Sequence, residues 1–336
     1  MTTWKAPGKL ILFGEHSVVY GKHAVAAALS LTTYATARYT PAQNTDPLTI
    51  TVHTAPGRHP TADDSARLEA AVRAIAGAHG TSTGGALEVW VRGNVPEGAG
   101  LGSSAALCVA TSAAVRDALA DYRCTAGPAW RTAVNAAALA GERVFHASPS
   151  GVDNTVSTHG GAVLFAPGAP LAHFALEGRG AAALRVLVVD TGVPRSTAAA
   201  VLAVRARRAA QPAAVDAALA RMDAIALAAF ALLQARPRDH RALDALVDEN
   251  HRLLRDTLGV GHPAIDRAVA LCAAAGVHAK ITGAGCGGCV FGFLAPTLAP
   301  RTLDGLTRAL TDAGMRPLVV TLGALGVSQV PAQPPL

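Results

Sequence analysis

Aromatic residues are scarce in this chain of 336 residues: they make up 4 % of it, whereas hydrophobic residues make up 51 %. Its cores must therefore be built mainly from Ala, Val and Leu. Long apolar runs are absent, because no stretch reaches the roughly 18–20 residues that a membrane helix needs. The start, MTTWKAPGKL, lacks the pattern of a secretory signal, and the five cysteines are scattered along the chain. We therefore expect a cytoplasmic protein with reduced thiols and no membrane partner.

Lysine is rare as well, since only four of the 29 Lys and Arg residues are lysines. The formal net charge of +6 could suggest nucleic acid, but the basic residues are spread out. Their densest cluster, Arg205, Arg207 and Arg208, lies on an Ala-rich helical segment without the interleaved aromatic residues that would stack on bases. We expect no nucleic-acid partner. Each of the few lysines is a candidate for a position that requires a compact point charge.

The common nucleotide-binding loop G-x-x-x-x-G-K-[ST] is also absent, yet the segment Pro96–Ala106, PEGAGLGSSAA, has the features of an anion site. Its glycines stand at every second position, at Gly98, Gly100 and Gly102. They allow a tight turn, and a helix that starts near Ser103 and Ser104 directs the positive end of its dipole at the same place. The alternative, a flexible linker, is disfavoured by the apolar Leu101 and Leu107. The Ser104 hydroxyl could also bind Mg²⁺.

A second glycine cluster, Gly283–Gly288, matches G-x-G-x-x-G. The segment after it, Cys289–Leu294, is typical of a strand rather than a helix, which excludes a dinucleotide-binding fold. Two interpretations stay open: a tight turn between strands, or a turn that packs against a ligand or the first glycine loop. Cys286 and Cys289 form a single C-x-x-C pair, so we expect no zinc site.

Polar residues flank a short predicted strand near the N-terminus. Lys9 precedes the strand Leu10–Phe13, and Glu15 and His16 follow it after a glycine. The arrangement indicates either a solvated strand end or a strand end that exposes an ammonium group and two titratable groups to a cleft.

Two carboxylates further along the chain are candidates for the remaining chemistry. Glu142 lies late in a predicted helix among apolar neighbours, so its side chain is expected to point inward. Asp153 follows a turn and could cap a helix or face the site. Mg²⁺ and an alcohol nucleophile each require a carboxylate, which favours a site role for both residues.

The chain is longer than a single core usually allows, so we expect two lobes, residues 1–191 and 192–336. The first lobe is predicted to contain strands and three helices, Ser65–His79, Ser104–Ala120 and Pro128–His146. The second begins with Ala/Leu-rich helices and ends in the order strand, strand, helix, strand. The final segment, VPAQPPL, is predicted to be frayed.

Taken together, these segments resemble the GHMP small-molecule kinases. The resemblance extends from Ala6 to about Leu322 and rests on APGKLILFGEHSVVYGKHAVAAAL, EGAGLGSSAA, GERVFHASPSGVDNTVSTHGGAV, DTGVPRST, and ENHRLLRDTLGVGH followed by HAKITGAGCGGC. It implies a two-lobed α+β fold with a ribosomal-S5-like N-terminal domain and a ferredoxin-like C-terminal domain. It further implies transfer of the γ-phosphoryl group of ATP to the C5 hydroxyl of mevalonate, with Mg²⁺ as cofactor; a homodimer is common in the family.

The resemblance also implies a role for each site residue. Asp153 would be the general base and Lys9 its cationic neighbour, while Ser104 and Glu142 would hold Mg²⁺. The residues implied to cradle the phosphates are Glu97, Gly98, Ala99, Gly100, Leu101, Gly102, Ser103 and Ser104. The residues implied to bind the acceptor substrate are Lys9, Glu15, His16, Asp153 and Thr197. His16 would pair with the substrate carboxylate, Thr197 would support the Lys9–Asp153 centre, Arg195 would help to bind phosphate, and Gly283–Gly288 would support the site from the second lobe.

The sequence departs from the family pattern at two positions: Cys286 stands where the family usually has Gly, and Tyr20 where animal-like relatives have His. Two other functions compete with this interpretation. One is a sister kinase that acts on phosphomevalonate or another small alcohol. The other is a catalytically silent sensor of the same fold, which is disfavoured because Lys9, Ser104 and both candidate carboxylates occur together.

Overall fold

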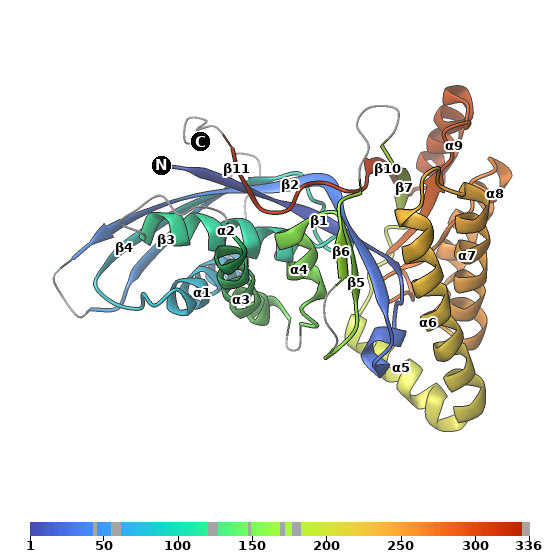
Figure 1. Cartoon of the computed structure of the whole chain (residues 1–336), viewed down its shortest axis with the longest axis horizontal. Coiled ribbons are helices and arrows are strands. Elements are labelled where there is room, and N and C mark those ends of the chain that lie inside the picture. The colour runs from blue at the N-terminus through green and yellow to red at the C-terminus, as the bar shows by residue number, and fades with distance from the viewer. Residues whose placement is uncertain are drawn as a thin grey trace.

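The computed structural model describes residues 1–42, 46–54, 62–119, 127–146, 149–168, 172–176 and 183–330. Within these ranges the chain forms two lobes that lie side by side, each built from one sheet and a set of helices (Figure 1). The elements of the first lobe are β1 (Thr3–Phe13), β2 (Ala24–Pro41), β3 (Thr49–Thr54), α1 (Ala62–Ala78), β4 (Gly85–Gly93), α2 (Ser103–Leu119), α3 (Pro128–Phe145), α4 (Val152–His159), β5 (Ala162–Phe165), β6 (Ala172–Phe174) and β11 (Ser328–Val330). Those of the second lobe are β7 (Arg185–Asp190), α5 (Thr197–Ala210), α6 (Pro212–Gln234), α7 (His240–Arg252), α8 (Pro263–Ala274), β8 (Lys280–Thr282), β9 (Cys289–Leu294), α9 (Pro300–Asp312) and β10 (Arg316–Thr321).

The first sheet has seven strands in the order β11-β1-β2-β4-β3, and β5 and β6 extend it from β2. Helices α1 to α4 cover one face (Figure 1). Strand β4 shows why only one face is covered, because Leu87, Val89 and Val91 are buried and alternate with more exposed residues. Helix α2 is rich in buried alanine, and these small side chains let it pack closely against β1 and β2.

The second sheet has four antiparallel strands in the order β10-β7-β9-β8. Every residue of β9 is buried. One hydrophobic cluster joins the two lobes, since it contains Leu10 and Leu12 of β1 together with Ile225 of α6 and Phe291 of β9. The lobes therefore share a continuous apolar core, and the strand that carries Lys9 lies at their junction.

The predicted elements agree well with the structure. The three predicted helices of the first lobe are confirmed as α1, α2 and α3, with ends within three residues, and the terminal order strand, strand, helix, strand is confirmed. The sequence missed the eight-residue helix α4, a 3-10 turn (η1, Ser17–Tyr20) and a π-helical turn after α7 (η3, Leu253–Thr257). No helix in the described ranges is both long and apolar enough to span a membrane.

The chain crosses between the sheets more than once. Strand β7 precedes residue 192 and yet lies in the second sheet, and β11 returns to the first sheet, where Val330 pairs with Thr3. The expected fraying of the tail is therefore wrong for Val330, while residues 331–336 lie outside the described part of the chain. Because of β11, the two ends of the described chain meet at one edge of the first sheet (Figure 1).

Candidate active site

The first glycine loop is a compact turn that leads directly into α2. Gly98, Gly100 and Gly102 have φ values of 70°, 77° and 75°, which lie in the left-handed region that glycine adopts at little cost. The residues between them, Ala99 and Leu101, are buried, so the loop is anchored in the core and is not a flexible linker. Its last glycine leads into Ser103, the first residue of the helix. The predicted glycine turn at a helix N-terminus is thus found in the described backbone, and anion binding there stays a prediction.

Lys9 and Asp153 form an ion pair beside this loop. Lys9 Nζ lies 3.0 Å from Asp153 Oδ2. The Lys9 amide donates to the carbonyl of Leu101 at 2.8 Å, and a Cβ on Gly102 would come within 2.7 Å of Lys9 Cγ. The absence of a side chain at Gly102 therefore lets the lysine pass close to the start of α2.

Asp153 is held by helix α4. Gly151 is the N-cap of that helix and Asp153 lies in its first turn, so the interpretation of Asp153 as a capping residue is wrong. Its side chain is 33 % exposed, whereas that of Lys9 is 6 % exposed. The carboxylate is thus the open member of the pair and is accessible to a small molecule.

Glu142 lies near the same pair. Its side chain is buried, as predicted, and burial raises its pKa from 4.5 to about 7. The negative charge of Asp153 raises the pKa further, while the Ser104 hydroxyl, Lys9 and Cys108 lower it. One carboxylate oxygen, Oε1, is buried and has no hydrogen-bond partner within the described part of the chain. Such a buried polar atom is costly unless something outside the protein binds it.

The second glycine turn connects the paired strands β8 and β9, as the first interpretation predicted, and the residue that follows the turn also contacts the first glycine loop. The Cys289 thiol donates to the carbonyl of Ala99 at 3.0 Å. Cys286, where the family usually has Gly, has a φ of 57°, and its amide donates to the carbonyl of Val260 at 2.8 Å. The chain therefore keeps a glycine-like backbone at this position despite the substitution.

Arg195 lies between the two turns. Its Nη1 donates to the carbonyl of Thr282 at 3.3 Å. A Cβ on Gly100 would come within 1.8 Å of Nη2, and one on Gly283 within 2.4 Å of Nη1. Both turns thus need glycine here to admit the guanidinium group, which brings a positive charge to the first loop.

Glu15 and His16 have protein partners instead of an open face. Both are buried, so the alternative of a solvated strand end is wrong. Glu15 Oε1 accepts from Lys280 at 2.5 Å, and Asn250 donates to its Oε2 at 3.2 Å. His16 donates from Nε2 to the carbonyl of Ala284 at 2.8 Å, and burial lowers its pKa. With its Nε2 proton donated to Ala284, a neutral His16 keeps only Nδ1 as an acceptor, so the expected pairing with a substrate carboxylate would require a second proton on the ring.

The structure thus brings together Lys9, Asp153, Glu142 and Ser104, the last of which also lies 3.2 Å from His146 Nε2. Thr197 is an exposed residue at the start of α5, and no contact of it with the Lys9–Asp153 pair is found in the described part of the chain.

Sequence reasoning did not assign Lys280 to the site. The only signal for it was the rarity of lysine.

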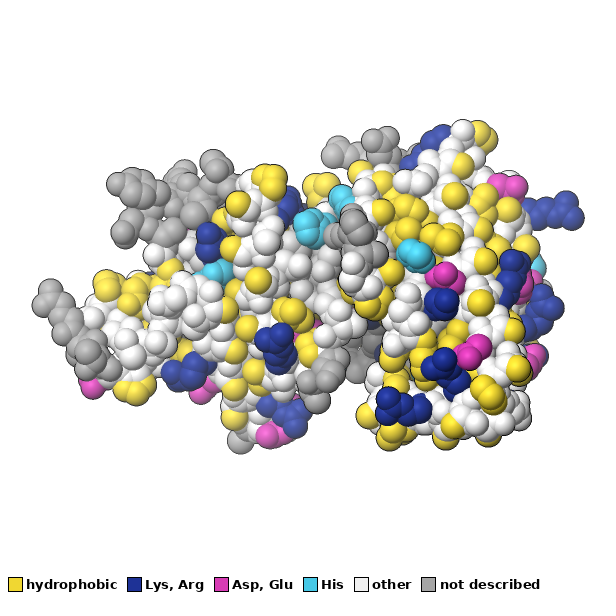
Figure 2. Space-filling model, turned by 60° about the horizontal axis from the view of Figure 1, so that its bottom comes forward, with side chains coloured by type: hydrophobic (Ala, Val, Ile, Leu, Met, Phe, Trp, Pro, Cys, Tyr) yellow, Lys and Arg dark blue, Asp and Glu magenta, His cyan; other side chains and the backbone are white. Residues whose placement is uncertain are grey.

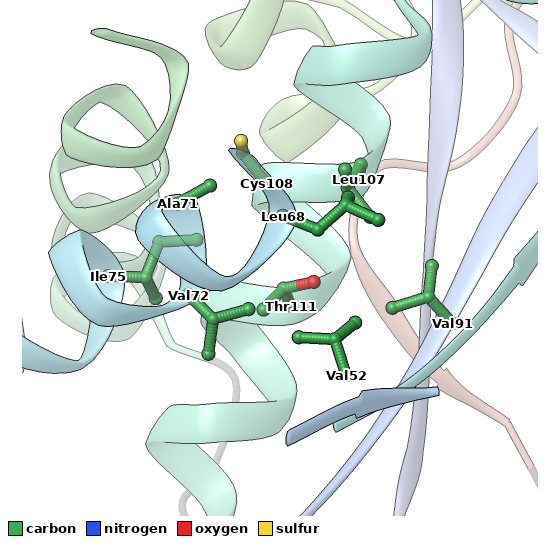
Figure 3. A pocket seen from close by; sticks show the side chains of 9 residues that line it. All are labelled: Val52, Leu68, Ala71, Val72, Ile75, Val91, Leu107, Cys108 and Thr111. Atoms are coloured by element: carbon green, nitrogen blue, oxygen red, sulfur yellow. The ribbon is translucent and has the colours of Figure 1, made fainter. Parts of the chain in front are cut away.

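A narrow apolar cavity of about 10 Å³ lies next to the N-terminal part of α2, between α1 and strands β3 and β4 (Figure 3). Its lining residues are Val52, Leu68, Ala71, Val72, Ile75, Val91, Leu107, Cys108 and Thr111. One of these lining residues, Leu107, is about one helical turn beyond Ser104.

Comparisons with known proteins agree with this architecture. The family models described as GHMP kinases N terminal domain and GHMP kinases C terminal match residues 66–161 and 226–311. A mevalonate kinase of Mus musculus is 34 % identical over 378 residues, which cover 96 % of this chain and 93 % of the relative. A mevalonate kinase of Archaeoglobus fulgidus is 35 % identical over 292 residues, which cover 85 % and 90 %. The crystal structure of L. major mevalonate kinase in complex with R-mevalonate matches with a TM-score of 0.76 at 26 % identity and covers 96 % of both chains.

The two-lobed fold and the glycine loop at a helix N-terminus define the class, and the chain belongs to the GHMP kinase family. The two relatives from Mus musculus and Archaeoglobus fulgidus point to one kind of kinase within this family. Both are mevalonate kinases, and both align with the chain over most of their length.

Proposed function

We infer that the chain is an ATP-dependent mevalonate kinase, which transfers the γ-phosphoryl group of ATP to the C5 hydroxyl of mevalonate and gives 5-phosphomevalonate. The observation that carries the inference is the Lys9–Asp153 pair beside the glycine loop, in a chain that aligns with mevalonate kinases over 96 % of its length. Phosphoryl transfer requires positioning and charge neutralisation more than covalent help from the protein, and these residues supply both.

Asp153 accepts the proton of the acceptor hydroxyl in this proposal. Its partly exposed carboxylate is the group of the pair that an alcohol can reach. Lys9 is nearly buried, so water screens its positive charge only weakly. It favours the alkoxide form of the hydroxyl and stabilises negative charge on the transferred group.

Ser104 and Glu142 are the residues that would hold Mg²⁺. The fit rests on the buried, unpartnered Oε1 of Glu142 and on the hydroxyl of Ser104 beside it, because hard cations prefer oxygen ligands. The described residues contain no cluster of three or more His, Cys, Asp or Glu side chains able to hold a metal ion. Mg²⁺ would therefore take its other ligands from phosphate and water, and when bound it neutralises charge on the β- and γ-phosphates.

ATP would lie along the start of α2. The amides of residues 97–104 and the helix N-terminus suit its phosphates, and the Arg195 guanidinium lies against Gly100 of the same loop.

The decisive experiment measures ADP release by the purified protein with Mg-ATP and one acceptor at a time: mevalonate, phosphomevalonate, galactose or homoserine. We expect turnover with mevalonate alone. Turnover with one of the other three would identify a sister kinase and overturn the substrate assignment. A protein that binds ATP and phosphorylates none of the four would support the silent sensor instead.

A further inference from the structure

Lys280 is a buried charge that the proposed reaction does not use. It lies on β8 in the second lobe, and its ammonium donates to Glu15 Oε1 at 2.5 Å, to the carbonyl of Leu12 at 3.0 Å and to the carbonyl of Ile281 at 2.7 Å. Three acceptors require all three N–H groups of the protonated amine. The side chains of Lys280 and Glu15 are both 0 % exposed, so the two charges neutralise each other away from water.

Two of the three acceptors belong to the first lobe, just beyond Lys9 in the sequence. Thr282, which lies two residues after Lys280 and thus on the same side of β8, donates to the carbonyl of Ile11 at 2.8 Å. Strand β8 therefore holds the chain between Ile11 and Glu15 through three hydrogen bonds from two side chains. This segment links the lysine of the reacting pair to the turn that follows β1.

The turn at Gly14–His16 needs such support, because its backbone is unusual. His16 has a φ of 61°, a conformation that non-glycine residues rarely adopt and that persists only where the surroundings impose it. The surroundings come from the second lobe: Lys280 and Asn250 bind Glu15, and the carbonyl of Ala284 accepts from the His16 ring.

A lysine suits this position better than the arginine that the chain otherwise prefers. The ammonium lies 5.5 Å from the ring centre of Phe13 and 5.1 Å from that of Phe291. The space between two aromatic rings and three oxygen atoms fits a compact charge with three donors. A planar guanidinium group is larger and has five donors to satisfy.

We propose that Lys280 is a positioning residue for phosphoryl transfer: through Glu15 and Leu12 it fixes the Gly14–His16 turn relative to Lys9, at the acceptor end of the site. The proposal rests on the proposed function for the identity of the acceptor. It assigns Glu15 a structural partner in the other lobe, so that the lobes must be docked for the acceptor side of the site to be formed.

The test compares Lys280→Met with Glu15→Gln, with the double variant, and with Lys5→Met, a control lysine on β1 of the first lobe. We expect Lys280→Met to lower kcat/KM for mevalonate by about 10- to 100-fold, as small displacements of reacting groups do. The KM for ATP should change less than about twofold, because the three hydrogen bonds of the Lys280 ammonium go to Leu12, Glu15 and Ile281 and none goes to the first glycine loop. Lys5→Met should match the wild type. A folded Lys280→Met variant with wild-type kcat and mevalonate KM would overturn the proposal.

The double variant Glu15→Gln/Lys280→Met shows whether Lys280 acts through Glu15. If Lys280 acts through Glu15, the double variant loses no more activity than the more damaged of the two single variants. If the losses of the two single variants multiply in the double variant, the two residues have independent roles and the proposal is overturned. The double variant leaves no unpaired charge in the core, because it removes both members of the pair. It therefore serves as the test protein if Lys280→Met does not fold. Lys280→Arg should fail to restore activity, and full activity of Lys280→Arg would contradict the need for a compact charge.

Hydrogen exchange separates this proposal from the proposed function, because it needs no substrate. Peptides that cover residues 10–20 should exchange faster in Lys280→Met, or in the double variant, than in the wild type and in Lys5→Met. Unchanged exchange there would overturn the positioning role even in an active enzyme. A wild-type protein that does not phosphorylate mevalonate would overturn the proposed function alone.

Discussion

The chain contains two lysine–carboxylate pairs of the same chemistry and opposite surroundings. The Lys9–Asp153 pair lies within the first lobe, and its carboxylate is 33 % exposed. The Lys280–Glu15 pair joins the two lobes, and both of its side chains are fully buried. In the first pair the carboxylate can still meet a substrate. In the second pair every ammonium donor already has an acceptor in the protein.

The difference follows from what burial does to a charge. Removing two charges from water costs several kcal/mol per ion, and mutual attraction offsets this only when the remaining hydrogen bonds are also made. The closed pair meets that condition and is suited to holding the lobes together. In the open pair the carboxylate keeps contact with water, which would leave Asp153 free for the proton transfer that we propose.

The largest expected effect is a difference in kcat between variants of the two carboxylates, Asp153 and Glu15. We predict that Asp153→Asn lowers kcat about 10²- to 10⁴-fold, the usual contribution of a general base, and leaves ATP binding intact. The factor by which Glu15→Gln lowers kcat should be at least ten times smaller, because Glu15 positions the turn after β1 and does not take the proton. Steady-state kinetics and calorimetric titration with ATP measure both. An Asp153→Asn enzyme that retains a tenth of the wild-type kcat would contradict the assigned role.

The second prediction separates the pairs by stability. Lys280→Met leaves the Glu15 carboxylate buried and unpaired, so the free energy of unfolding should fall by about 3–5 kcal/mol. Lys9→Met leaves Asp153 in partial contact with water, and the loss should be about 1 kcal/mol. Urea unfolding at neutral pH measures both. Equal losses in the two variants would mean that the two pairs do not differ in the way their burial indicates.

The glycine loop beside the open pair could be predicted from the sequence because its signal is local, whereas the pairing of Lys9 with Asp153 was only implied by the resemblance to the GHMP kinases. Alternating glycines before two serines specify a tight turn at a helix start, and that turn is found with the positive φ angles that glycine permits. Asp153 and Glu142 were found through the chemistry that Mg²⁺ and an alcohol require. The short helix that carries Asp153 was missed, since eight residues are too few to show a helical period.

The closed pair could not be predicted, because it depends on contacts between distant parts of the chain. Lys280 and Glu15 are 265 residues apart, and neither lies in a pattern that points to the other. The same limit explains why β11 was missed: its pairing with β1 is a contact between the two ends of the chain. Only the rarity of lysine marked Lys280 as unusual.

The smallest expected effect compares the two buried glutamates. Glu15 has a lysine partner, whereas Oε1 of Glu142 has no partner among the described residues. Burial raises the pKa of Glu142 to about 7, so the folded state binds this proton more tightly than the unfolded state does. Its contribution to stability is therefore present below pH 4.5 and is lost as the pH rises through about 7. The loss amounts to about 3 kcal/mol.

Glu142→Gln removes this titration while it keeps the shape of the side chain. Without Mg²⁺, we therefore predict that the variant gains stability over the wild type between pH 5 and pH 8, by up to about 3 kcal/mol. Glu15→Gln should lose stability throughout that range, because it leaves Lys280 unpaired. Urea unfolding in EDTA measures the difference at each pH. Mg-ATP should close the gap at pH 8, since a cation bound at Glu142 favours the ionised carboxylate. A difference between Glu142→Gln and the wild type that stays constant from pH 5 to pH 8 would mean that Glu142 is already neutralised by the protein, and the contrast with Glu15 would fail.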